Sequence, residues 1–496
     1  MQKKFITNLI ILLFLNLLIK PFWILGIDRS VQNVVGAADY GFYFAIFNFT
    51  FLFNILLDFG ITNFNNRNIA QNHQLLNKHL SSILVLKMLL FVFYCIISLG
   101  AGLIIGYNQK QIGMLALLGF NQFLISFILY LRSNVSGLHF FKTDSLLSVL
   151  DRALMIIICG VLLWGNVTST PFQIEWFIYA QTAAYILTAL IAFLIVVRKA
   201  KFSRLKWNRP FFFMIIKQSF PFAVLVLLMA FYNRIDSVML ERILPGRQGE
   251  EQAGIYASAY RLLDATNMIA YLFSVILLPM FARMLKFKQS VENLARLSFT
   301  LLFVLSIIVA ACSFFYSDEI MKLLYPQHAN ESMAVFQERI GQTSVIFGLL
   351  MAGFIPISTT YVFGTLLTSN GNLKQLNIVA ACGMVLNISL NFILIPRMLC
   401  LGSAYASLFT QFLTALVQVI LVQYIFKFRV NKIYLLKLTV FVVSVVGLGF
   451  LSKMLNVDWK IAISALAVCA ILIVAFIRLF SLRSLLNMFR KTEETS

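Results

Sequence analysis

The sequence predicts an all-α, polytopic membrane protein with about 14 transmembrane helices. Of its 496 residues, 60% are hydrophobic and only 12% are charged, and the mean hydropathy is +0.88. A soluble domain carries roughly 25% charged residues. The apolar residues gather in stretches of about 20 residues, which is the length that crosses a bilayer as a helix.

The first stretch is interpreted as a retained span rather than a signal peptide. Lys3 and Lys4 precede it, but the stretch is long, Lys20 interrupts it, and no small-residue cleavage site follows. The predicted spans cover roughly residues 5–26, 40–58, 80–106, 112–131, 145–164, 173–197, 218–240, 253–282, 297–316, 342–367, 376–395, 402–426, 434–452 and 460–477.

The charges are distributed unevenly between the connections. The net charge is +21, and with both termini in the cytoplasm 26 of the 40 Lys and Arg residues fall in cytoplasmic segments. This bias follows the positive-inside rule and sets the predicted orientation. In a membrane protein it gives no reason to expect a nucleic-acid partner. The six cysteines contain no Cys-x-x-Cys pair and the four histidines lack metal-ligand spacing, so no metal site is predicted.

Two halves of the chain show matching features in the same order. Span 2 opens with Tyr40-Gly41-Phe42-Tyr43 and span 8 with Ala253-Gly254-Ile255-Tyr256, while Asp28 and Asp236 end the spans before them. Six spans per unit give both units the same orientation. We therefore predict an N-terminal six-helix lobe at 1–205, a second at 206–430, and two extra helices with a cytoplasmic tail at 431–496.

The C-terminal half of the chain carries motifs that resemble a known family. They are Asn370-Gly371-Asn372-Leu373-Lys374, Leu386-Asn387, Leu390-Asn391, Ile395-Pro396 and the run from Leu401 to Ala406, together with the Gly-x-Tyr openings and Asp58-Phe59-Gly60. The chain resembles the Wzx-type polysaccharide flippases of the multidrug/oligosaccharidyl-lipid/polysaccharide (MOP) exporter superfamily. The resemblance implies two lobes around a V-shaped cavity in the bacterial inner membrane and translocation of a lipid-linked oligosaccharide. The implied partners are this substrate, membrane lipids and the polysaccharide polymerase machinery.

Several charges remain inside the predicted spans. A charge in such a position costs roughly 3 kcal/mol, so it usually faces a cavity or a partner. Lys and Arg in a cavity could bind the diphosphate of the substrate, and an amide could donate to its sugar hydroxyls. The candidate substrate-binding residues are Lys20, Lys87, Arg152, Arg234, Arg261 and Asn387.

Each candidate also has a structural interpretation. Arg261 and Asp264 are three residues apart on one helix face and could pair with each other. Lys20 and Lys87 could reach an interface, and Asn387 could bond a neighbouring helix. Asp28, Asp236 and Asp264 are candidates for coupling to H⁺ or Na⁺, with a counter-ion role as the alternative. No other cofactor is expected.

Three other functions compete with the flippase. A peptidoglycan lipid-precursor flippase would have the same span number and a cationic cavity. A drug or cation antiporter of the same superfamily would favour acidic and aromatic cavity residues, which the five in-span cations argue against. An enzyme would need a sizeable extramembrane segment, and the longest one, at roughly 317–341, is too short.

Overall fold

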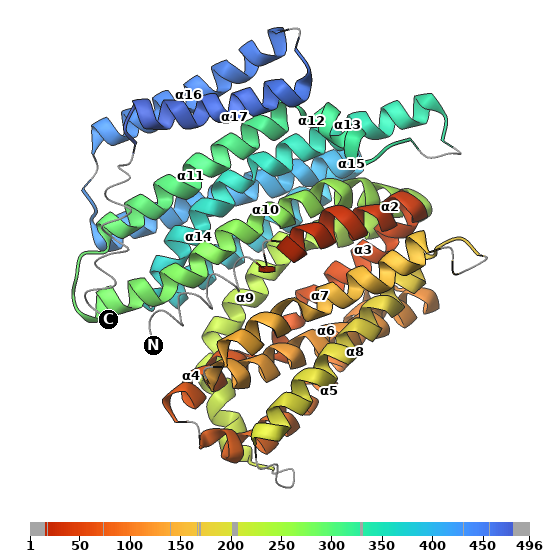
Figure 1. Ribbon diagram of the computed structural model, residues 1–496, viewed down its shortest axis with the longest axis vertical. Coiled ribbons are helices and arrows are strands. Elements are labelled where there is room, and N and C mark those ends of the chain that lie inside the picture. Colours follow the sequence, from red (N-terminus) through yellow and green to blue (C-terminus); the bar gives the residue numbers. More distant parts are fainter. Residues whose placement is uncertain are drawn as a thin grey trace. The chain divides into compact units, whose positions relative to one another are not determined.

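The computed structural model describes residues 15–16, 18–72, 74–138, 140–165, 167, 170–200, 207–327, 331–429, 431–455 and 457–479. Within these residues the chain forms helices and no strand, which confirms the predicted all-α class. The start of the first predicted span lies outside the described residues. Figure 1 shows the helices coloured along the chain.

Helices follow one another with short connections. The first half contains the π-helix η1 (Trp23–Asp28), α2 (Arg29–Val35), α3 (Ala37–Leu52), the 3₁₀-helix η2 (Asn54–Leu57), α4 (Ile61–Gln71), α5 (Leu75–Ile104), α6 (Gln109–Gly137), α7 (Phe141–Trp164) and α8 (Ile174–Lys199). The second half contains α9 (Arg209–Ile243), α10 (Gly246–Lys286), α11 (Glu292–Phe315), α12 (Ser317–Leu324), α13 (Met333–Ala352), α14 (Phe354–Ser369), α15 (Leu373–Phe426), α16 (Lys432–Met454) and α17 (Trp459–Phe476).

Eleven helical segments of the described chain are long and apolar enough to cross a membrane. One of them, α15, has 54 residues and would be about 80 Å long if straight. It is interrupted at Leu399, where φ is 54° and ψ is −138°, so it supplies two crossings. The continuous helix over residues 18–35 overlaps the end of the first predicted span, and α3 lies in the second. Helix is therefore present in every predicted span, as far as the structure describes it.

The chain forms two compact units, each described here by itself. Unit 1 contains Met1–Ser258 and Ile388–Cys400, and unit 2 contains Ala259–Asn387 and Leu401–Ser496. Unit 1 thus combines the predicted N-terminal lobe with α9, the start of α10 and the middle of α15. The proposed lobe boundaries near residues 205 and 430 stay a prediction.

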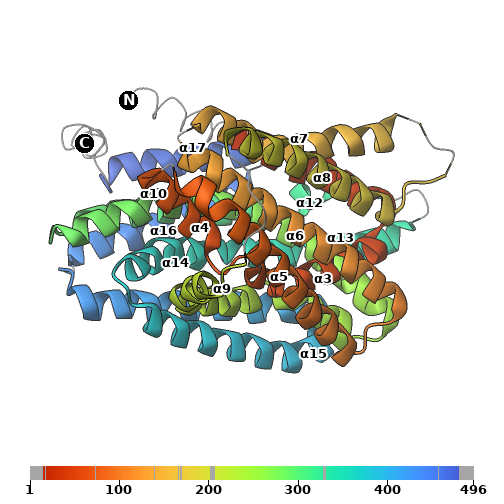
Figure 2. The ribbon, with the colours of Figure 1, turned by 90° about the horizontal axis from the view of Figure 1, so that it is seen from below.

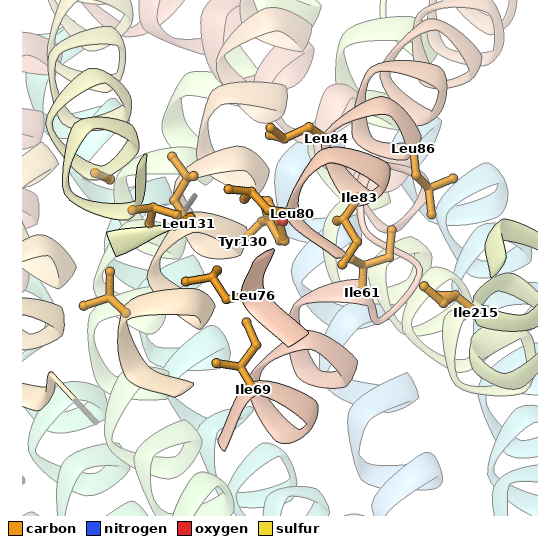
Figure 3. Packing of buried hydrophobic residues seen from close by; sticks show 14 of the residues in the cluster. Ile61, Ile69, Leu76, Leu80, Ile83, Leu84, Leu86, Tyr130, Leu131 and Ile215 are labelled. Carbon is orange, nitrogen blue, oxygen red and sulfur yellow. The ribbon is translucent and has the colours of Figure 1, made fainter. Parts of the chain in front are cut away.

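The apolar core of unit 1 joins α4, α5 and α6. Figure 3 shows Leu80 and Ile83 of α5 packed among side chains of the neighbouring helices, with Ile61 and Ile69 of α4 and Ile215 of α9 in the same cluster. Helix α4 lies in a segment predicted to be a cytoplasmic loop. Ile61 and Ile69, eight residues apart on one face of α4, are buried in this cluster, and Asn65 between them is also buried and donates to Ser133 Oγ (2.8 Å). Helices α7 and α8 pack side by side (Figure 2).

In unit 2 the last two helices pack together and against α11 (Figure 1). Phe441 and Val445 of α16, Val474 of α17 and Val304 of α11 are buried in one cluster. A side chain at Gly449 would collide with the Phe315 ring, so the glycine permits the close approach of α16 to α11. Small residues allow such helix contacts in membranes.

Two predicted connections contain helix. The segment 317–341 holds α12 and the first turns of α13, and α10 extends beyond the predicted span 253–282 at both ends. Ser332 caps α13 by accepting a hydrogen bond from Val335 N (3.4 Å), and Arg339 Nε lies 2.8 Å from Glu331 Oε1. Polar side chains thus support helix outside the apolar stretch, which a hydropathy pattern does not register.

Candidate functional site

Lys20 and Arg152 lie close together in unit 1. Arg152 projects from α7, and its guanidinium lies over the rings of Trp23 (5.5 Å) and Tyr185 (5.9 Å). Its Nε is 3.6 Å from Asp151 Oδ2. Lys20, on the first helix, is half-buried and within electrostatic range of Arg152 and Asp151. The structure therefore brings together two of the cations predicted to bind substrate.

A third cation, Arg132 at the end of α6, belongs to the same group. It lies within electrostatic range of Lys20, and its Nε is 2.8 Å from Asp144 Oδ1. We call Lys20, Arg132 and Arg152 the unit 1 cation group. Arg132 is not among the predicted site residues because it directly follows a predicted span and so falls in a predicted cytoplasmic connection. Two carboxylates, Asp144 and Asp151, accompany the three cations.

Lys87 is buried and its ammonium group is fully satisfied inside unit 1. Its Nζ donates to Asp58 Oδ1 (2.5 Å), to the Leu57 carbonyl (2.9 Å) and to Ser126 Oγ (2.9 Å). An ammonium has three donors, and these contacts use all of them. The arrangement ties η2 to α5 and α6 and favours a structural role for Lys87.

Arg234 of α9 lies against α3. Its guanidinium is 5.1 Å from the ring of Phe51, and the residue is half-buried. An arginine is attracted to the face of an aromatic ring, by about 0.5–2 kcal/mol depending on solvation. The contact holds the charge at a defined place on the α3 side of α9.

Arg261 and Asp264 belong to unit 2 and share a face of α10. Arg261 Nη1 lies 4.0 Å from Asp264 Oδ2, with 14% and 17% of the two side chains exposed. The predicted pairing along the helix is thus present, at the longest distance of an ion pair. Asn387, on α15, is also in unit 2 and is buried.

Asp28 and Asp236 have matching partners. Asp28 Oδ2 accepts a hydrogen bond from Tyr40 (2.8 Å), and Asp236 Oδ2 accepts one from Tyr256 (2.8 Å). Asp236 Oδ1 also accepts from Asn391 Nδ2 (2.8 Å). Both carboxylates are buried. In each predicted repeat, an aspartate is therefore bonded to a tyrosine of a later helix, Asp28 to Tyr40 of α3 and Asp236 of α9 to Tyr256 of α10.

The Gly-x-Tyr openings of the two repeats meet each other within unit 1. A side chain at Gly41 would collide with the Glu250 carbonyl and with Gly254 N, and one at Gly254 would collide with the Ala37 carbonyl. Gln32 Nε2 donates to the Gly254 carbonyl (3.0 Å), and Cys400 N donates to Gln252 Oε1 (3.2 Å). We call this set the outer interlock, after the side of the membrane on which the predicted orientation places it. Its members are Gln32, Gly41, Gln252, Gly254 and Cys400.

A charged pair at the end of α9 adds to the closure of this side. Glu241 is buried, pairs with the adjacent Arg242, and accepts a hydrogen bond from Gln111 Nε2 (2.7 Å). Arg242 lies 4.7 Å from the Tyr107 ring and donates to the Gly106 carbonyl (3.3 Å). Burial raises the pKa of the Tyr107 hydroxyl, so this ring stays neutral under the guanidinium. The sequence does not predict this contact, because it shows only two adjacent opposite charges, Glu241 and Arg242, at the end of a predicted span.

The described residues contain no group of three or more His, Cys, Asp and Glu side chains arranged to hold a metal ion. The distinctive features of the molecule are therefore a cation group inside a helical membrane unit and a packed contact at one end of it.

A sequence model for polysaccharide biosynthesis proteins matches residues 6–285, more than half of the chain. The chain belongs to the polysaccharide biosynthesis protein family. This confirms the resemblance at the level of the family. None of the curated proteins compared with the chain matches it in sequence.

Solved structures show that this member of the polysaccharide biosynthesis protein family has the fold of MOP superfamily transporters. The lipid II flippase MurJ in an inward closed conformation matches with a TM-score of 0.71 at 15% identity, covering 95% of this chain and 99% of that one. An inward-facing multidrug resistance MATE family transporter matches with a TM-score of 0.61 at 16% identity, covering 85% and 98%. A MOP superfamily transporter from Pyrococcus furiosus Vc1, whose binding pocket is described as reversed in polarity, matches at 0.52 and 14% identity, covering 85% and 95%.

Proposed function

We propose that this protein is a flippase that moves an undecaprenyl-diphosphate-linked oligosaccharide from the cytoplasmic to the periplasmic leaflet by alternating access. Membership in the polysaccharide biosynthesis protein family supports an oligosaccharide substrate. The observation that carries the proposal is the unit 1 cation group, Lys20, Arg132 and Arg152. The protein acts as a transporter in this proposal and carries out no sugar transfer.

The positive charges of the cation group favour the binding of an anion. Arg132 and Arg152 each lie beside a carboxylate, whereas among the described residues Lys20 forms no ion pair. A charged side chain at the centre of a bilayer costs roughly 2.5–3.5 kcal/mol, so such a charge usually has a partner or faces a water-filled cavity. A diphosphate would supply the missing negative charge, and the Arg side chains can hold phosphate oxygens with two parallel hydrogen bonds.

Three further side chains are proposed to contact the substrate, each considered within its own unit. Arg234 of unit 1 and Arg261 of unit 2 are cations for the phosphates or the glycan, and Asn387 of unit 2 is a donor for sugar hydroxyls. The prenyl tail stays in the lipid while the polar headgroup moves. Lys87, whose three donors are already used, contributes less to substrate binding than the sequence alone suggests.

Coupling to H⁺ or Na⁺ is proposed for Asp236, with Asp28 and Asp264 as further candidates. Asp236 is a buried carboxylate held by a tyrosine and an asparagine, so protonation or cation binding there would change two helix contacts. The variant Asp236→Asn keeps the shape and removes the charge. Transport by this variant that is unchanged at every pH and Na⁺ gradient would remove Asp236 from the coupling mechanism.

The proposed setting is the bacterial inner membrane, with both termini in the cytoplasm. The excess of Lys and Arg on one side of the spans supports this orientation. The partners are the lipid-linked oligosaccharide, membrane lipids and the polysaccharide polymerase machinery that would use the translocated unit. No nucleic-acid partner is proposed.

The test is translocation of a fluorescent lipid-linked oligosaccharide in proteoliposomes by wild type, K20A/R152A and the exposed-cation control K110A. We expect K20A/R152A to lose at least about 90% of transport, because two charge-assisted contacts of about 1.5–3 kcal/mol each are removed. K110A should retain it. Equal transport by all three folded proteins would overturn the proposed site.

A second candidate is translocation of a peptidoglycan lipid precursor. The likeness of the fold to a lipid II flippase favours it. Both lipids carry a prenyl diphosphate, so the assay must include both in separate arms and in competition. Preference for the peptidoglycan precursor would replace the oligosaccharide proposal. A drug or cation antiporter is the weaker alternative because the cation group repels a cationic substrate. Extrusion of a cationic dye by the protein would support this alternative.

A further inference from the structure

A pocket of about 540 Å³ lies in unit 2, and none of its lining residues is among the proposed substrate-binding residues. It is formed where α11 begins and where the connection from α15 enters α16. Its lining residues are Glu292, Arg296, Arg429, Asn431, Lys432 and Ile433. The predicted orientation places the pocket at the cytoplasmic surface of the membrane. Ligand pockets in proteins usually measure about 300–1,000 Å³, so a small headgroup fits.

Arg296 is held in the wall of this pocket by several contacts. Its Nη2 lies 2.6 Å from Glu292 Oε1 and donates to the Arg429 carbonyl at 3.3 Å. Its guanidinium lies 5.7 Å from the ring of Tyr434, whose hydroxyl is 2.7 Å from Thr300 Oγ1. The connection between α15 and α16 is thereby fixed against α11, so the pocket is a built feature of unit 2.

The pocket has an excess of positive charge. Glu292 offsets one of the three cations, and among the described residues neither Arg429 nor Lys432 pairs with a carboxylate. Helix α16 begins at Lys432, with Asn431 accepting hydrogen bonds from Ile433 N (2.9 Å) and Tyr434 N (3.2 Å). The amino end of a helix adds a partial positive charge. The lining therefore suits a group with at least one negative charge.

The positive lining continues directly into an apolar surface. Ile433 and Leu436, on the first turns of α16, are 67% and 63% exposed, and Leu435 is 49% exposed. In a membrane such side chains face lipid tails. A ligand with a charged head and apolar chains matches both surfaces, whereas a soluble anion matches only the first.

We propose that this pocket binds the phosphate-bearing headgroup of an anionic membrane lipid, with Arg429 and Lys432 on the phosphate and the acyl chains along the first turns of α16. Basic pockets between transmembrane helices on the cytoplasmic side recognise such headgroups. The lipid stays bound beside the last two helices and is not translocated. The site is independent of the cation group in unit 1, so its test does not depend on flippase activity.

Binding of phosphatidylglycerol and of phosphatidylcholine to the full-length protein tests the proposal, with native mass spectrometry in detergent as the readout. We expect phosphatidylglycerol to bind wild type preferentially and R429Q/K432Q about 30-fold more weakly, at about 1 kcal/mol for each cation removed. Arg296 contacts the backbone carbonyl of Arg429, so these substitutions leave that contact in place. The control K453Q/K460Q removes two cations far along the chain from the pocket, one at the end of α16 and one at the start of α17. This variant should bind phosphatidylglycerol like wild type.

Four outcomes would overturn the proposal. Equal binding of both lipids by wild type, or an equal loss in K453Q/K460Q, would mean that the pocket has no headgroup preference of its own. Displacement of phosphatidylglycerol by millimolar inorganic phosphate would assign the pocket to a free anion. Binding of undecaprenyl diphosphate but not phosphatidylglycerol would make it a first contact for the transported substrate. Thermal unfolding of each variant confirms that it is folded.

Discussion

Gly41 and Gly254 pack backbone against backbone, although they lie at the openings of predicted spans in different predicted repeats. A Cβ atom at either position would enter the space of a carbonyl group on the other segment. Neither obstructing group is a flexible side chain, so a substitution must move a helix. The motif that indicates the repeat in sequence is therefore the surface at which the repeats meet on the predicted outer side.

The outer interlock should open when a side chain is added. We expect Gly254→Val to expose Cys400, which is 2% exposed and donates its backbone N–H to Gln252. The measurement is the labelling rate of Cys400 by a membrane-impermeant maleimide in a protein whose other cysteines are replaced by alanine. The rate should rise at least about tenfold, since overpacking costs about 1–3 kcal/mol in the closed arrangement.

The matched control for this experiment is Gly113→Ala in α6, because nothing lies within 4 Å of a Cβ atom added there. It should label at the rate of the parent protein. If Gly254→Val stays folded and labels no faster than this control, the interlock is not what shields Cys400.

The two carboxylate–tyrosine pairs should contribute to stability to a similar extent. We expect Tyr40→Phe and Tyr256→Phe each to lower the free energy of unfolding by about 1–3 kcal/mol, because each removes a hydrogen bond to a buried carboxylate. Thermal unfolding in detergent measures both. A loss of stability in only one of the two variants would contradict the similar role of the two pairs.

The sequence predicted the helical class and the positions of the described crossings because these depend on local signals. Stretch length and hydropathy decide where a helix can cross a bilayer. The break in α15 was placed within the predicted connection at 396–401, and it falls on Leu399. Helix α4 and the helices in 317–341 were missed because their stability comes from packing and capping rather than from apolar length.

The site was harder to predict because it depends on which side chains meet. The in-span position of Lys87 suggested an anion site, yet Asp58 lies 2.5 Å away, brought there by a turn that hydropathy does not show. The Lys20–Arg152 group and its third member, Arg132, come from three separate helices. Pairing across helices depends on helix rotation, and a single sequence contains no direct record of it.

The connection at Leu399 should be strained. Its φ of 54° and ψ of −138° lie in a region that glycine adopts readily and leucine does not, at a cost of about 1–3 kcal/mol. Leu399→Gly should therefore raise the free energy of unfolding by about 1 kcal/mol, after the loss of half-buried side-chain contacts and the larger chain entropy of glycine. Leu399→Ala keeps the strain and loses the contacts, so it should be less stable than wild type. Unfolding midpoints of the three proteins in the same detergent decide this order.

The Lys87–Asp58 pair should behave as a structural unit. Lys87→Met leaves the Asp58 carboxylate without its cation and should lower stability by about 3 kcal/mol, at the lower end of the range for buried pairs because Asp58 is 23% exposed. The double variant K87M/D58N should recover most of that loss. Thermal unfolding and transport are measured on the same preparations. A double variant that is stable but inactive in transport would indicate that Lys87 contacts the substrate.

Substitution of Lys20 should directly weaken the binding of an anion. Removing it relieves repulsion from Arg132 and Arg152, so Lys20→Gln should be as stable as wild type or more stable without ligand. With saturating undecaprenyl diphosphate, wild type should gain about 2–3 kcal/mol, as expected near 100 times the dissociation constant. Lys20→Gln should gain less than half of this at the same concentration. Lys322→Gln, which replaces a half-exposed cation paired with Asp318, is the control. If undecaprenyl diphosphate stabilises Lys20→Gln and wild type equally, the cation group does not bind the diphosphate.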